Sequence, residues 1–151
     1  MRKADLGSKR GIAVTLVLVA AMLALGGCGG DDEDPSEQVL GAWAGKVSGG
    51  KKGDIRIELQ ANVIALRKGQ VSGTVYFPDL AGKGPCSGAW LYEGRDGAGL
   101  RFEEEIVTNT NPLCTGSGRV RLDPTSDGES LRYEWRSGSL KTTGTLDRQE
   151  G

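Results

Sequence analysis

Over most of the chain, hydrophobic and polar residues alternate along short segments and do not recur every three or four positions. In one such segment Leu131, Tyr133 and Trp135 fall on one face. The charged residues Arg132 and Glu134 fall on the other. A period of two with one polar face is typical of antiparallel strands that line a core on one side. The pattern therefore predicts β-strands.

Short segments rich in Gly, Asn, Asp and Pro separate the alternating stretches, and these residues suit tight turns. The pattern predicts eight strands, near residues 41–48, 53–63, 70–77, 87–93, 99–107, 117–122, 130–136 and 140–147. Consecutive hairpins of this kind favour an all-β fold, a single small antiparallel up-and-down β-barrel or half-barrel. A two-sheet β-sandwich is the alternative.

One charged residue falls on an apolar face. Leu100, Phe102 and Ile106 alternate in register, and the same alternation turns Glu104 inward with them. A carboxylate that faces a core is costly unless it is hydrogen-bonded or neutralised. Glu104 therefore either lines a ligand cavity or orders the core by binding backbone amides or a tryptophan indole. Aromatic residues that line such a cavity, or simply fill the core, are Trp43, Phe77, Trp90, Tyr133 and Trp135.

The first residues have a different pattern. A basic segment, residues 1–10, precedes fifteen uncharged residues that run from Gly11 to Leu25. Fifteen residues rise about 22 Å as a helix, less than the roughly 30 Å hydrocarbon core of a membrane. This predicts a cleaved signal peptide over residues 1–27, in preference to a transmembrane anchor.

The sequence Leu25-Gly26-Gly27-Cys28 resembles the lipobox of bacterial lipoproteins. The resemblance implies cleavage before Cys28 and a diacylglyceryl group, with palmitate-type chains, on its sulfur. The protein would then be lipid-anchored to the cell membrane on its extracytoplasmic side. Residues 28–37, rich in glycine and acid, would form a flexible tether to the folded module over 38–151.

Three cysteines are present. If Cys28 is lipidated, Cys86 and Cys114 remain, and in an exported protein they are expected to form a disulfide. Closing their loop would stabilise the fold by roughly 3–4 kcal/mol in the chain-entropy model. The chain has no histidine and no CxxC motif, so we predict neither a metal site nor a cofactor.

The charge and the residue content of the chain argue against two classes of function, nucleic-acid binding and catalysis. Residues 38–151 carry fifteen basic and fourteen acidic residues without a basic stripe, which argues against nucleic-acid binding. Without histidine, a Ser-His or Cys-His nucleophile pair is impossible. A hydrolase that uses Glu103 and Glu105 is the least favoured alternative, since adjacent acids on an outer face are usually solvated. We expect no enzymatic activity.

The order of several motifs resembles a small extracytoplasmic domain of actinobacteria. That domain occurs in secreted lipoproteins and at the C-terminus of some membrane Ser/Thr protein kinases. The matching segments are Trp43–Gly45, Gly73–Pro78, Cys86–Leu91, Leu100–Ile106, Cys114–Leu122, Leu131–Trp135 and Gly144–Arg148. The resemblance implies an exported sensing or binding module with its two cysteines bonded. The chain has no kinase signature, so no kinase activity follows.

A second resemblance covers the ends of the module. Gly41-Ala42-Trp43 matches the G-x-W of the first strand in lipocalin-like barrels. In those barrels an arginine of the last strand covers the tryptophan. The resemblance implies that Arg148 lies over Trp43 and closes the barrel there.

We expect a non-catalytic sensing or protein-interaction module with an unidentified partner. Its binding surface would be the loops 78–86 and 107–115, with Leu80, Pro112 and Leu113 exposed. A lipocalin-like carrier of a small apolar ligand is the alternative.

Overall fold

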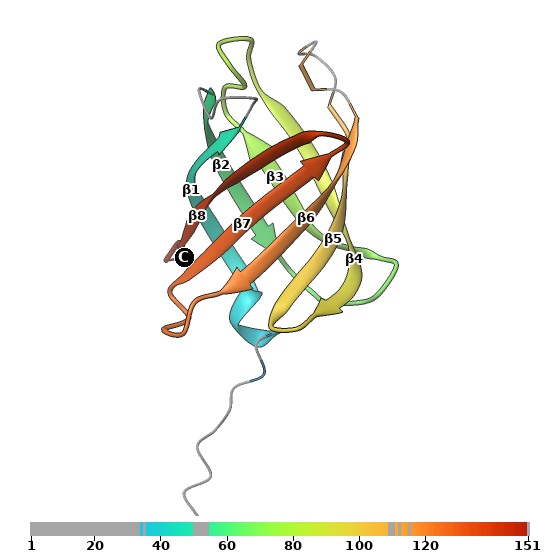
Figure 1. Ribbon diagram of the computed structural model, residues 1–151, viewed down its shortest axis with the longest axis vertical. Coiled ribbons are helices and arrows are strands. Elements are labelled where there is room, and N and C mark those ends of the chain that lie inside the picture. The colour runs from blue at the N-terminus through green and yellow to red at the C-terminus, as the bar shows by residue number, and fades with distance from the viewer. Residues whose placement is uncertain are drawn as a thin grey trace, which may run out of the picture. The chain divides into compact units, whose positions relative to one another are not determined.

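A computed structural model describes residues 34, 36–49, 55–108, 111, 113–114 and 116–150. These form a 3-10 helix and eight strands (Figure 1). The elements are η1 (Glu37–Val39), β1 (Gly41–Gly49), β2 (Ile55–Val63), β3 (Val71–Phe77), β4 (Cys86–Asp96), β5 (Gly99–Ile106), β6 (Ser117–Pro124), β7 (Ser130–Ser137) and β8 (Leu140–Arg148). The expected signal peptide and Cys28 lie outside the described residues. Among the described residues, no helix has the length and apolar character needed to cross a membrane.

The strands form one closed antiparallel barrel. Each strand pairs with its neighbours in chain order, and β1 also pairs with β8. This confirms the up-and-down barrel and excludes the sandwich. The observed strands match the predicted ranges to within three residues, and the largest difference is the extension of β4 to Asp96. That extension carries a register shift between Tyr92 and Gly94.

Closure depends on a close approach of β1 and β8. Gly45 pairs with Leu146 across this seam. A Cβ on Gly45 would lie only 2.1 Å from the backbone oxygen of Thr145. Glycine at this position therefore allows the two strands to pair without a steric clash.

The alternation is interrupted in β3. In the sequence, Val71 alternates in register with Val75 and Phe77, a pattern that predicts an inward Val71, but Val71 is 54% exposed. The register shifts between Val71 and Gly73, and this irregularity turns Ser72 inward. The buried Ser72 hydroxyl donates a hydrogen bond to the backbone oxygen of Gln70, so its burial leaves no orphan donor.

The end of the barrel that carries η1 is filled. Val39 is fully buried, and its backbone oxygen accepts a hydrogen bond of 2.9 Å from Trp43 Nε1. The Arg148 guanidinium lies 4.3 Å from the centre of the Trp43 ring, the arrangement that the lipocalin-like resemblance implies. Its N–H groups donate to the backbone oxygens of Gln38, Leu40 and Gly128. Arg148 thereby links η1, the β6–β7 turn and the last strand.

The opposite end carries a disulfide. Cys86 and Cys114 are bonded, with their Cα atoms 5.7 Å apart, which confirms the predicted pairing. The bond joins the start of β4 to the β5–β6 connection. The β3–β4 and β5–β6 connections are therefore tied together at this end (Figure 1).

Replacing Arg148 by Ala should lower the free energy of unfolding by about 1–3 kcal/mol. The change uncovers the Trp43 ring and removes the donors to three backbone oxygens. Urea unfolding followed by tryptophan fluorescence measures the loss. Arg132→Ala, on the exposed outer face of β7, is the matched control. Equal stability of the two variants would contradict the assigned role of Arg148.

The double substitution Cys86→Ala and Cys114→Ala should lower the free energy of unfolding by about 3–4 kcal/mol, because the disulfide closes a loop of 28 residues in the unfolded chain. Chemical unfolding of the variant, compared with oxidised and with fully reduced wild type, gives the value. The reduced wild type should resemble the variant. If reduction leaves stability unchanged, the disulfide does not constrain the unfolded chain as expected.

Candidate functional site

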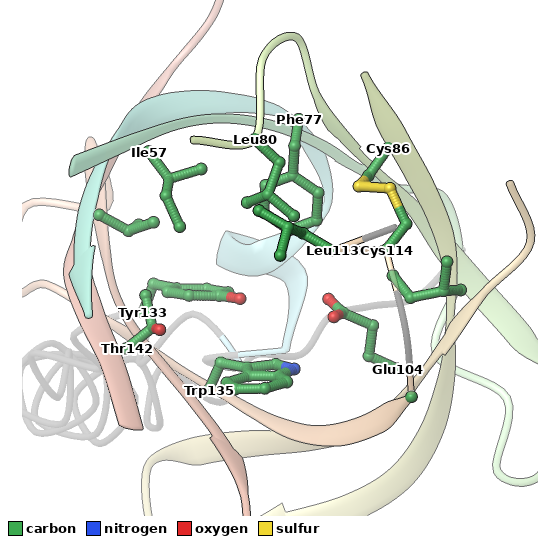
Figure 2. A pocket seen from close by; sticks show the side chains of 13 residues that line it. Ile57, Phe77, Leu80, Cys86, Glu104, Leu113, Cys114, Tyr133, Trp135 and Thr142 are labelled. Carbon is green, nitrogen blue, oxygen red and sulfur yellow. A yellow bond between two sulfur atoms is a disulfide. The ribbon is translucent and has the colours of Figure 1, made fainter. Parts of the chain in front are cut away.

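A pocket of about 110 Å³ lies at the disulfide end of the barrel (Figure 2). Apolar side chains make most of its wall, namely Val47, Ile57, Phe77, Leu80, Ile106 and Leu113. The polar side chains that reach it are Glu104, Tyr133, Trp135 and Thr142. The disulfide forms one side of the wall. The barrel is thus filled at the η1 end and hollow at the other.

Two leucines from the connections help to line the pocket. Leu80 was expected to be exposed, but it is partly buried and packs against the core. Its loop is held back by Asn111, whose side-chain amide donates a hydrogen bond of 2.8 Å to the backbone oxygen of Gly84. Leu113 is 49% exposed and lines the mouth of the pocket. Pro112 lies outside the described residues.

Glu104 is 3% exposed on the inner face of β5, as the alternation predicted. It pairs across the ladder with Trp90 of β4, which is fully buried. Trp90 Nε1 donates a hydrogen bond of 2.9 Å to Glu104 Oε2. The two roles considered for Glu104 are therefore combined, because one carboxylate oxygen binds an indole while the side chain also lines the pocket.

Burial sets the protonation chemistry of this site. Desolvation raises the pKa of Glu104, and the indole N–H groups of Trp90 and Trp135 act in the opposite direction by favouring the charged form. Burial also raises the pKa of Tyr133 well above its ordinary value, and the nearby charge of Glu104 adds to this. The Tyr133 phenol is therefore a neutral group at physiological pH.

The indole of Trp135 lies beside Glu104. Glu104 pairs with Gly118 of β6, and a Cβ on Gly118 would lie 2.1 Å from Trp135 Nε1. Glycine thus leaves the space that the indole occupies. Trp135 Nε1 is buried and has no hydrogen-bond partner. Its N–H is near enough to favour the charged carboxylate but does not complete a hydrogen bond with it.

Of the aromatic residues predicted to line a cavity or fill the core, most lie in or next to the pocket and one lies at the η1 end of the barrel. Phe77 lines the pocket with Tyr133 and Trp135. Trp90 lies behind Glu104 and packs on Tyr133, with 6.3 Å between ring centres. Trp43 was a candidate for the same lining, but the structure places it at the η1 end, away from the pocket.

Sequence reasoning missed several residues of the pocket. Thr142 lies on β8, where only Leu146 is fully buried and the alternation is weak. Leu80 lies on an irregular connection, where no periodicity indicates its direction. Gly118 offered one usable signal, since a glycine inside a strand often marks the close approach of another group.

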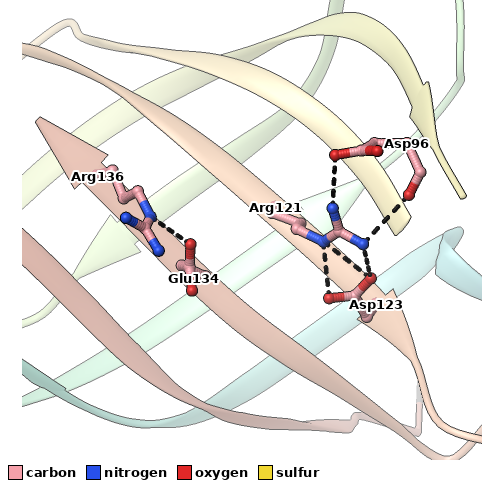
Figure 3. A network of polar contacts seen from close by, with 5 residues as sticks. All are labelled: Asp96, Arg121, Asp123, Glu134 and Arg136. Atoms are coloured by element: carbon pink, nitrogen blue, oxygen red, sulfur yellow. Dashed lines mark hydrogen bonds and ion pairs between the residues drawn. The ribbon is translucent and has the colours of Figure 1, made fainter. Parts of the chain in front are cut away.

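The outer wall carries ion pairs (Figure 3). Arg121 donates to both carboxylate oxygens of Asp123 and to Asp96. Arg136 and Lys141 pair with Glu134 and lower its pKa to about 2. These groups are largely solvated and contribute little individually to stability.

Within the described part of the chain, no three His, Cys, Asp or Glu side chains come together as a metal site.

Comparisons with known proteins bear on the fold. No protein-family model matches the chain. No curated protein matches it either. It is similar to a solved structure of a redesigned beta barrel, with a TM-score of 0.56 and 16% identity over 78% of this chain and 96% of that one. At this identity the likeness supports the barrel fold alone.

The raised pKa of Glu104 gives a test in solution. Between the ordinary value of 4.5 and the higher pKa of the folded state, the folded protein keeps a proton that the unfolded chain releases. The free energy of unfolding should therefore fall as the pH rises through this range. Glu104→Gln removes this titration and retains an acceptor for Trp90. The variant should gain stability relative to wild type as the pH rises above 4.5.

Urea unfolding at a series of pH values from about 4 to 8 measures this difference. Glu103→Gln is the matched control, because Glu103 precedes Glu104 in β5 and is exposed. A stability difference between Glu104→Gln and wild type that does not change with pH would show that burial of Glu104 carries no such cost.

Proposed function

We propose that this protein is a non-catalytic, lipid-anchored binding protein of the extracytoplasmic side. In this proposal the disulfide end of the barrel holds a small, largely apolar molecule, or the apolar end of a larger one. One observation carries the proposal: an apolar pocket of about 110 Å³ contains a buried carboxyl group and a buried indole N–H without a partner.

The contrast between the two barrel ends favours ligand binding over simple core filling. At the η1 end, Val39, Trp43 and Arg148 fill the interior, and the indole N–H of Trp43 is bonded. At the disulfide end space remains, and polar atoms reach it. A few convergent polar groups within an apolar pocket are typical of small-molecule sites.

The volume limits the ligand. An engineered apolar cavity of about 150 Å³ accommodates benzene. The pocket here is comparable, so it suits one small ring or the end of a chain that enters between the connections. A bulky lipid would not fit inside entirely.

The anchoring and the absence of catalysis are supported by the sequence. The lipobox-like Leu25–Cys28 supports a lipid on Cys28 and an extracytoplasmic location. The chain has no histidine, and both cysteines of the module are bonded to each other. The resemblance to the extracytoplasmic domain of actinobacterial kinases and lipoproteins supports a sensing role for the bound ligand.

Protein interaction at the same end is the second candidate function. Val107 is 67% exposed and Leu113 is 49% exposed, both on the β5–β6 connection. The disulfide holds this connection against β4. Exposed apolar residues on a constrained connection suit a protein partner.

Binding of phenol, a small probe with an apolar ring, tests the proposed pocket. The full chain is reconstituted in phosphatidylcholine nanodiscs, and the indole N–H signals are followed by NMR during titration. Phenol should shift the Trp135 signal, because Trp135 lines the pocket, and leave that of Trp43 unchanged. Ile57→Trp should fill the pocket and abolish the shift.

Ile64→Trp is the matched control, since Ile64 is 65% exposed and lies outside the pocket. It should bind phenol as the wild type does. If the wild type shows no saturable shift, or if Ile57→Trp binds equally well, the pocket is not a binding site and the surface around Leu113 becomes the better candidate.

A further inference from the structure

The polar atoms in the pocket restrict the chemistry of its ligand. This inference rests on the proposed function and deepens it. We propose that the pocket recognises a hydroxyl group on an otherwise apolar molecule. Trp135 Nε1 donates to the hydroxyl oxygen, and the hydroxyl proton is donated to Glu104.

The first step concerns Trp135. Its Nε1 is buried and has no partner, whereas the indoles of Trp43 and Trp90 donate to Val39 and Glu104. Buried donors without a partner are rare in native structures. In Figure 2 the indole nitrogen of Trp135 points across the pocket towards the carboxylate of Glu104. A ligand atom that accepts a hydrogen bond would satisfy this donor.

The second step concerns the other carboxylate oxygen of Glu104, Oε1. Trp90 donates to Oε2, and the Trp135 N–H lies near the carboxylate without completing a hydrogen bond to it. The side chain is 3% exposed and lines the pocket. A ligand group that donates a hydrogen bond would satisfy this oxygen when the carboxylate is charged.

A hydroxyl satisfies both groups with a single oxygen. It accepts from the indole and donates to the carboxylate, and it has two lone pairs, so it can accept from both groups when Glu104 is protonated. A carbonyl cannot donate to a charged Glu104. An ammonium group would lie against the positive edge of the indole, and a carboxylate against the charge of Glu104.

The rest of the pocket requires an apolar body. Phe77, Leu80 and Leu113 lie above the polar pair in Figure 2, and Ile57 lies to one side. No charged side chain other than Glu104 lines the pocket among the described residues. Beyond the polar pair, only the Tyr133 and Thr142 hydroxyls of the described residues reach the pocket, so a sugar with its many hydroxyl groups would bury several of them without partners, at a cost in affinity.

The experiment compares phenol with toluene, which have the same ring and differ in the hydroxyl and methyl groups. The full chain in phosphatidylcholine nanodiscs is titrated with each probe, and free aqueous probe concentrations are measured against empty nanodiscs. Phenol should bind at least about tenfold more tightly than toluene, because its hydroxyl satisfies two buried polar groups. Phenol should also move the Trp135 indole proton downfield.

Trp135→Phe removes the N–H donor and keeps an aromatic wall. This variant should bind phenol and toluene within about twofold of each other, with toluene affinity near that of wild type. Glu104→Leu is the second variant, because it removes the carboxyl group that the hydroxyl contacts. It should also reduce the preference for phenol. Glu103→Gln, on the outer face, should retain the preference.

The outcomes separate the two proposals. Equal binding of phenol and toluene by wild type overturns hydroxyl recognition and leaves an apolar binding pocket. A preference for phenol that persists in Trp135→Phe overturns the assignment to the indole. Absence of saturable binding of either probe overturns both proposals, and the polar pair is then bridged by water only. A preference lost in Trp135→Phe and kept in Glu103→Gln supports the inference.

Discussion

Closure of the sheet between β1 and β8 is the constraint on which the rest of the structure depends. A barrel has no free edge, so every inward residue must share one interior. The seam forms because Gly45 lets β8 approach without a clash at the Thr145 oxygen. Once the seam exists, the inner positions of all eight strands face one another, and the small diameter determines which side chains can meet.

Closure also makes the two ends different. At the η1 end, Arg148 lies over Trp43 and binds the backbone oxygens of the segment that enters the barrel, so helix, first strand and last strand support each other. At the other end the Cys86–Cys114 bond ties two connections together above the interior. The first arrangement fills space and the second encloses it. A rigid barrel with one filled end and one hollow end is suited to holding a small molecule.

Glu104 links packing to the proposed function. Its hydrogen bond with Trp90 compensates part of the cost of burial, and the remaining desolvation still raises its pKa. The neighbouring Gly118 leaves room for the Trp135 indole, so a carboxyl group and an unpaired donor come together in an apolar setting. The same buried carboxyl that orders the β4–β5 pair thus supplies the polarity that a ligand would recognise. The outer ion pairs of Arg121 and Glu134 play no part in this site, because they lie in solvent.

The sequence by itself determined the strands, the inward direction of Glu104 and the pairing of the two cysteines. The first two depend on local alternation, and the third depends on the lipobox-like Leu25–Cys28, which sets Cys28 apart from the other two cysteines. None of these requires knowledge of distant contacts. The tertiary structure decided the exposure of Val71, since a register shift depends on the partner strand. It also decided that Leu80 covers the pocket and that Trp135 lacks a hydrogen-bond partner. These features depend on the stagger between neighbouring strands and on the path of the loops across the barrel end. The alternation of hydrophobic and polar residues in the sequence determines neither of them.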